Sequence, residues 1–301
     1  MRRFWAAIFF LALATSHAAE YRPTPVNPGG GRAQATYVFG FHPHLNPQEL
    51  VAAYQPILDY LEQHIPNVKF QLEGAKDYSE FEARLVARRY HFALPNPVQT
   101  LIAQRVGYHV IAKNFPDEDF RGALVTREGR ITGLRQLSGE TLCFPSATAV
   151  AATLLPLWYL HRHGVDVKSL RLQYTGTQVA ALLNAGAGDA AACGVSVRFL
   201  RAFQRDEPNK AARLAVLFVT DPSPHNAIVA RADVPAALKE KVAATLAAMA
   251  ADPTVDASRF KLGQHRFERA SDETYRPFRA FLERYDAEIG LPAALKPVIA
   301  R

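Results

Sequence analysis

The feature that most constrains the fold is a regular alternation of short strand-like runs with segments of helical periodicity. The β-branched and aromatic run at residues 36–41 predicts a strand, and Asn46 and Pro47 then suit the N-cap and first turn of a helix ending near His64. The same series continues with strands at 68–72 and 91–94 and helices at 79–89 and 97–104. This β-α-β order predicts a mainly parallel sheet flanked by helices.

After strands near 108–112 and 122–126, the alternation starts again. The second series has expected strands at 141–144, 170–174, 190–195 and 215–219, and expected helices at 147–163, 178–185 and 197–204. Two later helices, at 234–250 and 272–289, are expected to pack back on the first lobe. With 301 residues, the chain exceeds one typical domain. We therefore predict two lobes, 33–126 plus 228–301 and 127–227, joined by two crossovers that form a hinge.

The first 18 residues have the organisation of a signal peptide. Arg2 and Arg3 precede an apolar run from Phe4 to Ala14, and small residues follow at positions 16–18. The alternative is an uncleaved anchor. Residues 19–32, rich in Pro and Gly, are expected to be a flexible leader. No later run is long enough to span a bilayer, so we expect a periplasmic protein without direct membrane insertion after cleavage.

The charge of the chain limits the classes of partner it can bind, and its cysteines bear on whether it contains a disulfide. The formal net charge is +7, but the basic residues are dispersed, whereas a nucleic-acid-binding surface needs a basic stripe. We therefore expect no nucleic-acid partner. An oxidising compartment permits a disulfide between the two cysteines, Cys143 and Cys193, and two buried thiols are the alternative.

The strand-to-helix junctions hold the candidate binding residues. Ligands of open α/β sheets bind beyond the carboxyl ends of strands, where helix N-termini favour anions. Three junctions are polar: 42–47, 95–100 and 145–148. In the third, Ser146 and Thr148 offer hydroxyl donors, although simple helix capping is the alternative.

Other candidates have equally plausible structural roles. Tyr78 is either a ligand contact or a core aromatic residue, and Thr177, before Gln178, is either a ligand contact or an N-cap. His42 and His44 are weak evidence for a metal without further ligands, so neither a metal nor a cofactor is expected. No motif of a known catalytic class stands out, and we expect that the chain is not an enzyme.

Five segments together resemble a known family. They are FGFHPHLNPQELVAAYQPILDYLEQHI (39–65), Asp77-Tyr78 with FEARL (81–85), HFALPNPVQTLIA (91–103), ITGLRQLSGETLCFPSATA (131–149) and NAGAGDA (184–190). Their order is similar to that in the phosphate/phosphite/phosphonate-binding proteins of ABC importers, the PhnD-like family. The resemblance implies a two-lobed periplasmic-binding-protein fold of type II that delivers a small oxyanion to an inner-membrane ABC permease.

The resemblance also implies ligand contacts. Tyr78, Ser146 and Thr148 match ligand-contacting positions of the family, and the loop 96–100 matches more loosely. The full set of candidate ligand-binding residues is His44, Tyr78, Asn96, Gln99, Thr100, Ser146, Thr148, Thr177 and Gln178.

The chain departs from the family pattern at several of these positions. Gln99-Thr100 replaces a Ser-Tyr pair, Asn96 replaces a Gly, and Ala147 replaces the middle hydroxyl of a Ser-Thr-Ser loop. Gln178-Val179 replaces a His-Asp pair, which disfavours an aminophosphonate ligand.

Two other functional classes remain open at this point. A free periplasmic sensor that signals to a membrane kinase would use the same two lobes. An enzyme of related fold would need a base beside a nucleophile in the cleft.

Overall fold

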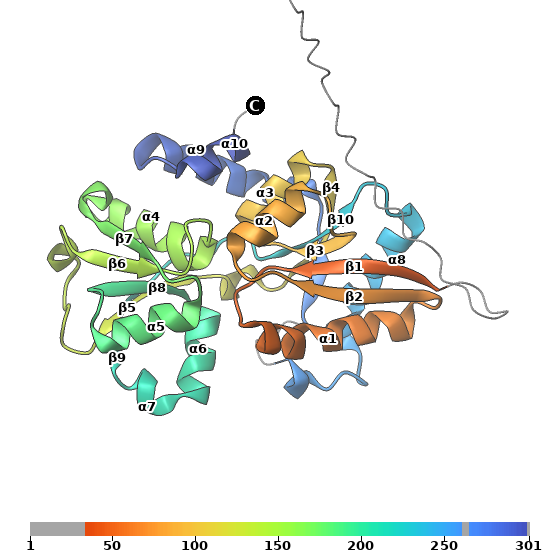
Figure 1. Ribbon diagram of the computed structural model, residues 1–301, viewed down its shortest axis with the longest axis horizontal. Coiled ribbons are helices and arrows are strands. Elements are labelled where there is room, and N and C mark those ends of the chain that lie inside the picture. The colour runs from red at the N-terminus through yellow and green to blue at the C-terminus, as the bar shows by residue number, and fades with distance from the viewer. Residues whose placement is uncertain (1–33, 261–264, 300–301) are drawn as a thin grey trace, which may run out of the picture.

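Two mixed β-sheets organise the chain, one in each of two lobes that lie side by side (Figure 1). The computed structural model describes residues 34–260 and 265–299, so the predicted signal peptide (1–18) and leader (19–32) lie outside the described residues. Within these ranges no helix is both long and apolar enough to cross a membrane.

The first sheet has six strands. The sequence predicts four of these six, and all four lie in the first half of the chain. In spatial order they are β11 (Phe267–Arg269), β4 (Tyr108–Asn114), β10 (Ala227–Arg231), β3 (Phe92–Leu94), β1 (Ala35–Phe41) and β2 (Val68–Gly74). Strand β1 is parallel to both β2 and β3, whereas β10, which enters from the other lobe, is antiparallel to β3 and β4. The sheet is therefore mixed, with β1 to β4 running in one direction and only β10 and β11 in the other.

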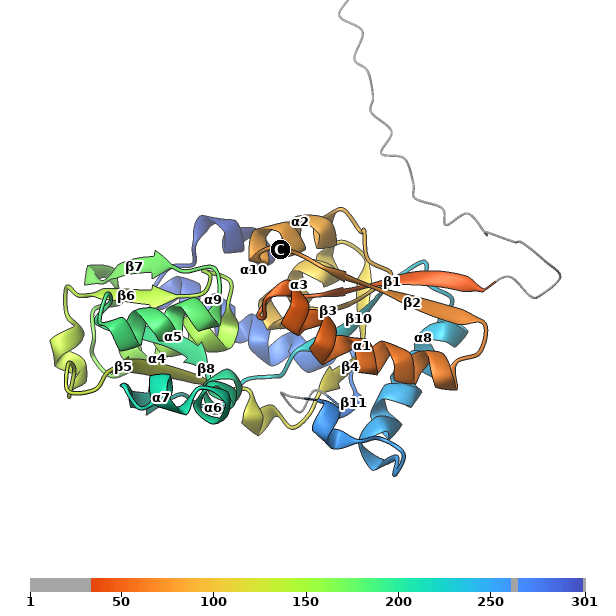
Figure 2. The ribbon, with the colours of Figure 1, turned by 60° about the horizontal axis from the view of Figure 1, so that its bottom comes forward.

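Helices cover both faces of this sheet (Figure 1 and Figure 2). One face buries the phenylalanines of β1 against α1 (Pro47–His64) and α8 (Ala236–Ala248). The other face packs on α2 (Tyr78–Val86) and α3 (Pro97–Arg105). Asn46 caps α1 as predicted, with Pro47 in the first turn.

The second sheet has five strands. Their spatial order is β7 (Arg171–Tyr174), β6 (Thr141–Phe144), β8 (Ala192–Ser196), β5 (Gly122–Arg127) and β9 (Leu214–Val219). One face packs on α5 (Gln178–Ala187), α6 (Val197–Asp206) and α7 (Pro208–Ala211), and the other on α4 (Leu155–Arg162). Cys143 and Cys193, opposite one another on β6 and β8, form a disulfide, which settles the alternative that the sequence left open.

The crossovers differ from the predicted lobe boundaries. Strand β5 pairs with β8 and β9, so it belongs to the second lobe, and the first crossover spans residues 115–121 instead of falling near 126. The second crossover spans 220–226, close to the predicted position. The two crossovers are hydrogen-bonded to each other, because the N–H of Ser223 donates to the carbonyl of Phe120 (3.1 Å). They form a two-stranded hinge.

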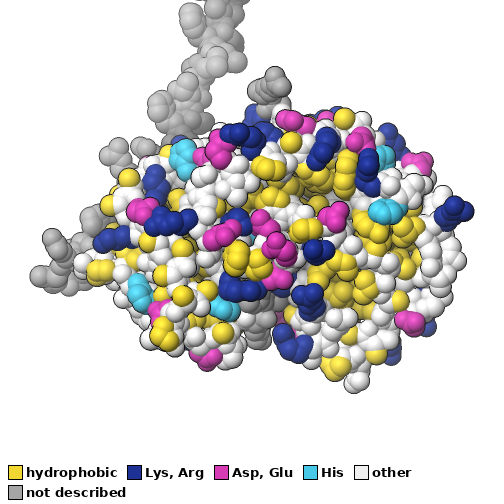
Figure 3. Space-filling view, turned by 180° about the vertical axis from the view of Figure 1, so that it is seen from behind, with side chains coloured by type: hydrophobic (Ala, Val, Ile, Leu, Met, Phe, Trp, Pro, Cys, Tyr) yellow, Lys and Arg dark blue, Asp and Glu magenta, His cyan; other side chains and the backbone are white. Residues whose placement is uncertain are grey.

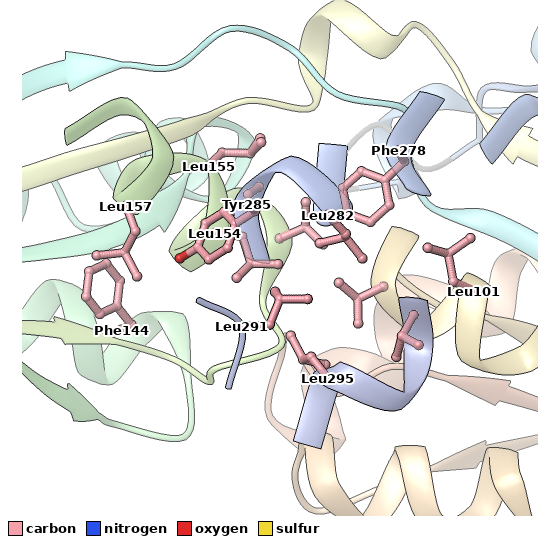
Figure 4. Packing of buried hydrophobic residues seen from close by; sticks show 14 of the residues in the cluster. Leu101, Phe144, Leu154, Leu155, Leu157, Phe278, Leu282, Tyr285, Leu291 and Leu295 are labelled. Atoms are coloured by element: carbon pink, nitrogen blue, oxygen red, sulfur yellow. The ribbon is translucent and has the colours of Figure 1, made fainter. Parts of the chain in front are cut away.

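Helix α9 (Arg276–Glu288), close to the C-terminus, contacts both lobes, whereas the sequence predicts that this helix packs on the first lobe alone. Figure 4 shows Phe278 and Leu282 on the side of Leu101, which belongs to α3, while Tyr285 lies beside Leu154 of the second lobe. The ring of Tyr285 also stacks on Trp158 of α4, with centroids 6.1 Å apart. This third connection stabilises the arrangement of the lobes.

The helix predicted over residues 147–163 begins later, with a wider turn. Residues Val150–Leu154 form a π-helix, and α4 follows it. At two strand glycines, Gly122 and Gly194, a Cβ atom would clash with the carbonyl oxygens of this turn. The glycines therefore allow the sheet to approach the π-helix closely. Wider turns of this kind are frequent at functional sites.

Candidate functional site

A small cavity lies between the lobes and against the hinge. Its volume is about 60 Å³, which gives room for roughly four to six groups the size of a water molecule. The cavity is lined by His42, His44, Tyr54, Tyr78, Asn96, Asn114, Asp119, Phe120, Ala149, Val150, Ala151, Ala152, Gln178, Ser196, Arg198, Phe199, His225 and Asn226. Both lobes and both crossovers therefore contribute to one cavity with polar and apolar walls.

Three histidines line the side of the cavity formed by the first lobe and the hinge. His42 and His44 follow β1, and their rings stack with centroids 4.5 Å apart. His44 donates from Nδ1 to the carbonyl of His42 (3.0 Å), while its Nε2 accepts from the hydroxyl of Tyr54 (3.2 Å). His225 lies in the second crossover, where its Nδ1 accepts from the N–H of Asn226 (2.7 Å). Because a neutral imidazole has one donor nitrogen, His225 carries its proton on Nε2.

Burial keeps these three histidines neutral at physiological pH. Burial, helped by Arg198 and opposed by the hydrogen bond to the carbonyl of His42, lowers the pKa of His44 to about 4. Burial, followed by the effect of His44, holds the pKa of His42 well below its ordinary value. For His225, burial and then Arg198 have the same effect. The imidazoles therefore act as neutral hydrogen-bonding groups.

Arg198 supplies the positive charge of the cavity. Ser196 caps α6 by accepting from the N–H of Phe199 (3.3 Å), which places Arg198 in the first turn of the helix. Arg198 has no ion pair with a carboxylate among the described residues. Asp119, the carboxylate in the cavity lining, is bonded to Arg266 instead (2.7 Å). Burial lowers the pKa of Arg198, while Tyr54 and Asp119 raise it. A partly buried cation of this kind favours an anionic partner.

Four buried polar atoms of cavity-lining residues have no hydrogen-bond partner within the described part of the chain. They are Nδ1 of His42, Nη2 of Arg198, Nε2 of His225 and Oδ1 of Asn226. Buried polar groups in folded proteins are normally bonded, and each unsatisfied group costs about 1–3 kcal/mol. Their collection around one cavity marks a place where a bound ligand would satisfy several buried groups at once.

Backbone N–H groups add to these donors. The start of the π-helix, residues 149–152, forms part of the cavity wall. The first N–H groups of a helix have no partner within it and carry the positive end of its dipole. Together with α6, this gives two helix N-termini at the cavity, an arrangement that suits an anion.

The predicted site residues fall into two groups. His44, Tyr78, Asn96 and Gln178 line the cavity. The other five lie outside its lining and make structural hydrogen bonds: Gln99 with Asn96 and Glu82, Thr100 with the carbonyl of Asn96, Ser146 with Thr148, Thr148 with Glu82, and Thr177 as the N-cap of α5.

Two hydrogen bonds near the cavity cross from one lobe to the other. The hydroxyl of Thr148 donates to the carboxylate of Glu82 (2.6 Å), and the side chain of Asn96 donates to the carbonyl of Thr148 (2.9 Å). Burial raises the pKa of Glu82, while the bonds from Thr148 and Gln99 lower it. We call Glu82, Asn96, Gln99 and Thr148 the interlobe clasp.

Sequence reasoning missed Arg198, His225 and Asn226. Arg198 follows a predicted strand and opens a predicted helix, which is the same signal that selected the other junctions. His225 and Asn226 lie in a crossover without periodicity, where no pattern marks them. His42 was considered as a weak metal ligand, but among the described residues no group of three or more His, Cys, Asp or Glu side chains could hold a metal ion.

Comparison with known proteins identifies the family. The family model for periplasmic substrate-binding proteins of phosphonate ABC transporters matches residues 39–275. The chain belongs to this family. The family resemblance of the sequence motifs is thereby confirmed, and with it the class of ABC-transporter substrate-binding proteins. No curated protein sequence matches the chain at a significant level.

Solved structures of phosphonate- and sulfonate-binding proteins share the fold of this family member. A binding protein of an ABC phosphonate transporter from Pseudomonas aeruginosa has 17% identity and a TM-score of 0.75, covering 88% of this chain and 94% of its own. PhnD1 from Prochlorococcus marinus, solved with methylphosphonate, has 14% identity and a TM-score of 0.76, covering 84% and 99%. The alkanesulfonate-binding protein SsuA from Xanthomonas axonopodis, bound to MOPS, has 15% identity and a TM-score of 0.65, covering 89% and 98%. The predicted two-lobed type II fold is confirmed.

Proposed function

We propose that this chain binds a small oxyanion of the phosphonate, phosphite or phosphate type in the interlobe cavity. The observation that carries the proposal is the guanidinium of Arg198, buried beside three neutral histidines without a carboxylate partner in the described residues. An oxyanion would accept hydrogen bonds from Arg198 Nη2 and His225 Nε2. Hydrogen bonds to a charged group are the strong ones, and removal from water strengthens them further.

The size of the cavity supports a ligand with few atoms. A tetrahedral oxyanion with one short substituent is comparable to the available 60 Å³. The family and the sequence together support the cellular role: export to the periplasm with a cleaved signal peptide, and delivery of the ligand to an inner-membrane ABC permease. The hinge and the interlobe clasp support capture by closure of the lobes.

We propose binding without turnover. His44 uses both ring nitrogens in bonds to His42 and Tyr54, His225 carries its proton on its free nitrogen, and Ser196 caps a helix, so these groups are not placed as a base beside a free nucleophile. A nucleophile in the cavity would need a histidine base within hydrogen-bond distance. Incubating the protein with excess methylphosphonate and observing a released product by phosphorus NMR would overturn this part of the proposal.

The test of anion binding is Arg198→Gln, with Arg201→Gln as its matched control. Arg201 lies one turn further along α6 and is exposed. Calorimetric titration with methylphosphonate, phosphite and phosphate should give a dissociation constant about a hundredfold higher for Arg198→Gln, because removing one partner of a buried charged contact costs about 2–5 kcal/mol. Arg201→Gln should bind as the wild type does.

Two results would contradict the proposal. If none of the three anions binds the wild-type protein, the ligand class is wrong, although the family assignment stands. If Arg198→Gln binds as tightly as Arg201→Gln, the anion site lies outside this cavity.

A further inference from the structure

The pair formed by Asn226 and His42 sets a condition on the ligand that Arg198 does not. The side-chain amide of Asn226 lies 3.0 Å from Nε2 of His42. The remaining polar atoms of the pair, Oδ1 of Asn226 and Nδ1 of His42, are both buried and have no partner among the described residues. Each side chain is more than nine-tenths buried, with relative exposures of 8% and 6%. Neither atom is therefore exposed at the molecular surface.

This pair presents one hydrogen-bond acceptor in either orientation of the amide. If the Asn226 nitrogen donates to Nε2 of His42, then Asn226 Oδ1 is the free acceptor and His42 Nδ1–H is the free donor. If the amide is turned round, Nε2–H of His42 donates to Asn226, and Nδ1 of His42 becomes the free acceptor. Because a neutral imidazole has one donor and one acceptor, the pair always keeps one of each.

The other polar groups without a partner at this cavity are donors. Nη2 of Arg198 has only hydrogens to offer, and Nε2 of His225 carries the proton of that ring. An oxyanion without a proton could satisfy these donors through its oxygens. It would, however, place oxygen lone pairs against the acceptor of the Asn226–His42 pair and leave that acceptor unsatisfied.

Resting on the proposed function, we propose that the cavity selects oxyanions that carry one proton over fully ionised oxyanions of the same size and charge. The O–H of a hydrogen phosphonate would donate to the Asn226–His42 pair, while its remaining oxygens accept from Arg198 and His225. Methanesulfonate has the same tetrahedral shape and the same single charge but no proton to donate. Specificity then follows from a buried acceptor that one ligand satisfies and the other does not.

The three histidines around the pair are neutral near neutral pH, so they do not titrate together with the ligand. Burial keeps His42, His44 and His225 neutral, as described above. The remaining groups are the hydroxyls of Tyr54, Tyr78 and Tyr275, the Arg266–Asp119 pair, and Lys113, which is bonded to Asp117 and Glu268. Burial raises the pKa of the Tyr78 hydroxyl.

The test compares methylphosphonate with methanesulfonate by calorimetric titration of the wild-type protein. Below the second pKa of methylphosphonate, both ligands are monoanions. We expect methylphosphonate to bind at least about tenfold more tightly, since an unsatisfied buried acceptor costs about that factor or more. As the pH rises above the second pKa, its affinity should fall in proportion to the protonated fraction, while the affinity for methanesulfonate stays constant.

Two substitutions at Asn226 separate the acceptor from general damage. Combined with His42→Phe, which removes the ring acceptor of the pair, Asn226→Leu removes the amide acceptor at similar volume, so the two ligands should then bind within a few-fold of each other. Asn226→Asp keeps an acceptor, so the preference for methylphosphonate should persist. If the double variant does not fold, the pH dependence of the wild type and the Asn226→Asp variant still decide the question.

The outcomes distinguish the two proposals. Equal binding of the two ligands by the wild type, or an affinity for methylphosphonate that does not change with pH, would overturn the selection of a proton while leaving the anion site intact. A wild-type protein that binds neither ligand would overturn both proposals.

Discussion

The two lobes contribute opposite kinds of chemistry to the cavity between them. The second lobe provides the charge of Arg198 and the N-termini of α6 and the π-helix. The first lobe provides neutral rings and amides: His42, His44, Tyr78 and Asn96. One side of the cavity is thus electropositive, and the other is neutral but rich in directed hydrogen-bonding groups.

Because of this difference, the groups that attract a small anion are not the groups that distinguish one anion from another. A charge and two helix dipoles attract any small anion, and their effect depends little on its shape. Neutral groups that offer a set number of donors and acceptors distinguish anions by where their protons lie. On the proposed function, the second lobe provides most of the affinity, and closure of the first lobe and the hinge adds specificity. Away from the cavity the charges are mixed, with basic and acidic side chains interspersed on the face shown in Figure 3.

The largest expected effect concerns the disulfide, which stabilises the second lobe alone. Cys143 and Cys193 are 50 positions apart in the sequence of that lobe, and both cysteines of the chain are in it. A cross-link of this length stabilises by about 4 kcal/mol in the chain-entropy description. In the double variant Cys143→Ala with Cys193→Ala, hydrogen exchange measured by mass spectrometry should accelerate strongly in β6 and β8 and much less in β1 and β2. Equal acceleration in both lobes would show that they unfold as one unit.

Acid should act on the opposite lobe. His44 has a pKa of about 4 in the folded protein, against 6.5 for an ordinary histidine. The unfolded chain therefore binds its proton first, so the stabilisation is complete above about pH 6.5 and is lost as the pH falls towards 4. The maximum loss from this one group is about 3 kcal/mol. Urea unfolding at a series of pH values should show it.

His44→Asn tests the source of the acid sensitivity, and His163→Asn is its matched control. His163 is exposed on the second lobe, at the end of α4. The first substitution should reduce the pH dependence between about pH 6.5 and 4 by the contribution of one histidine, with those of His42 and His225 remaining, whereas the second should leave it unchanged. If the free energy of unfolding of His44→Asn keeps the full wild-type dependence on pH, the acid sensitivity arises elsewhere, and folding does not hold His44 neutral.

The fold could be predicted from the sequence because its signals are local. Alternating periodicity located the strands, and capping chemistry located several helix starts: the side chains of Asn46, Asp77 and Thr177 accept hydrogen bonds from N–H groups in the first turn. The lobe boundary was less accessible, because the residues of β5 predict a strand equally well in either sheet. Only the pairing with β8 and β9 assigns it.

The site could be predicted only in part because its chemistry depends on long-range contacts. Thr148 has the same residue type whether it contacts a ligand or Glu82, which is 66 positions earlier in the sequence. His225 and Asn226 become important only because the second crossover places them beside His42, 184 positions from Asn226. The π-helix likewise depends on glycines in two distant strands. Junction polarity therefore identified the right region, but not which polar groups remain unpaired.

The smallest expected effect comes from the interlobe clasp, where side chains of the two lobes bond to each other directly. Thr148→Val keeps the shape of the side chain but removes its hydrogen bond to Glu82 (2.6 Å). A hydrogen bond to a charged group contributes about 1.5 kcal/mol or more, so ligand affinity should fall about tenfold as the closed form loses stability. The matched control is Thr132→Val, an exposed position of the second lobe. Calorimetry measures the affinity, and small-angle X-ray scattering of the ligand-free variant should show a larger radius of gyration than in the wild type. Unchanged affinity and unchanged scattering would mean that the cavity groups and α9 hold the lobes closed without help from the clasp.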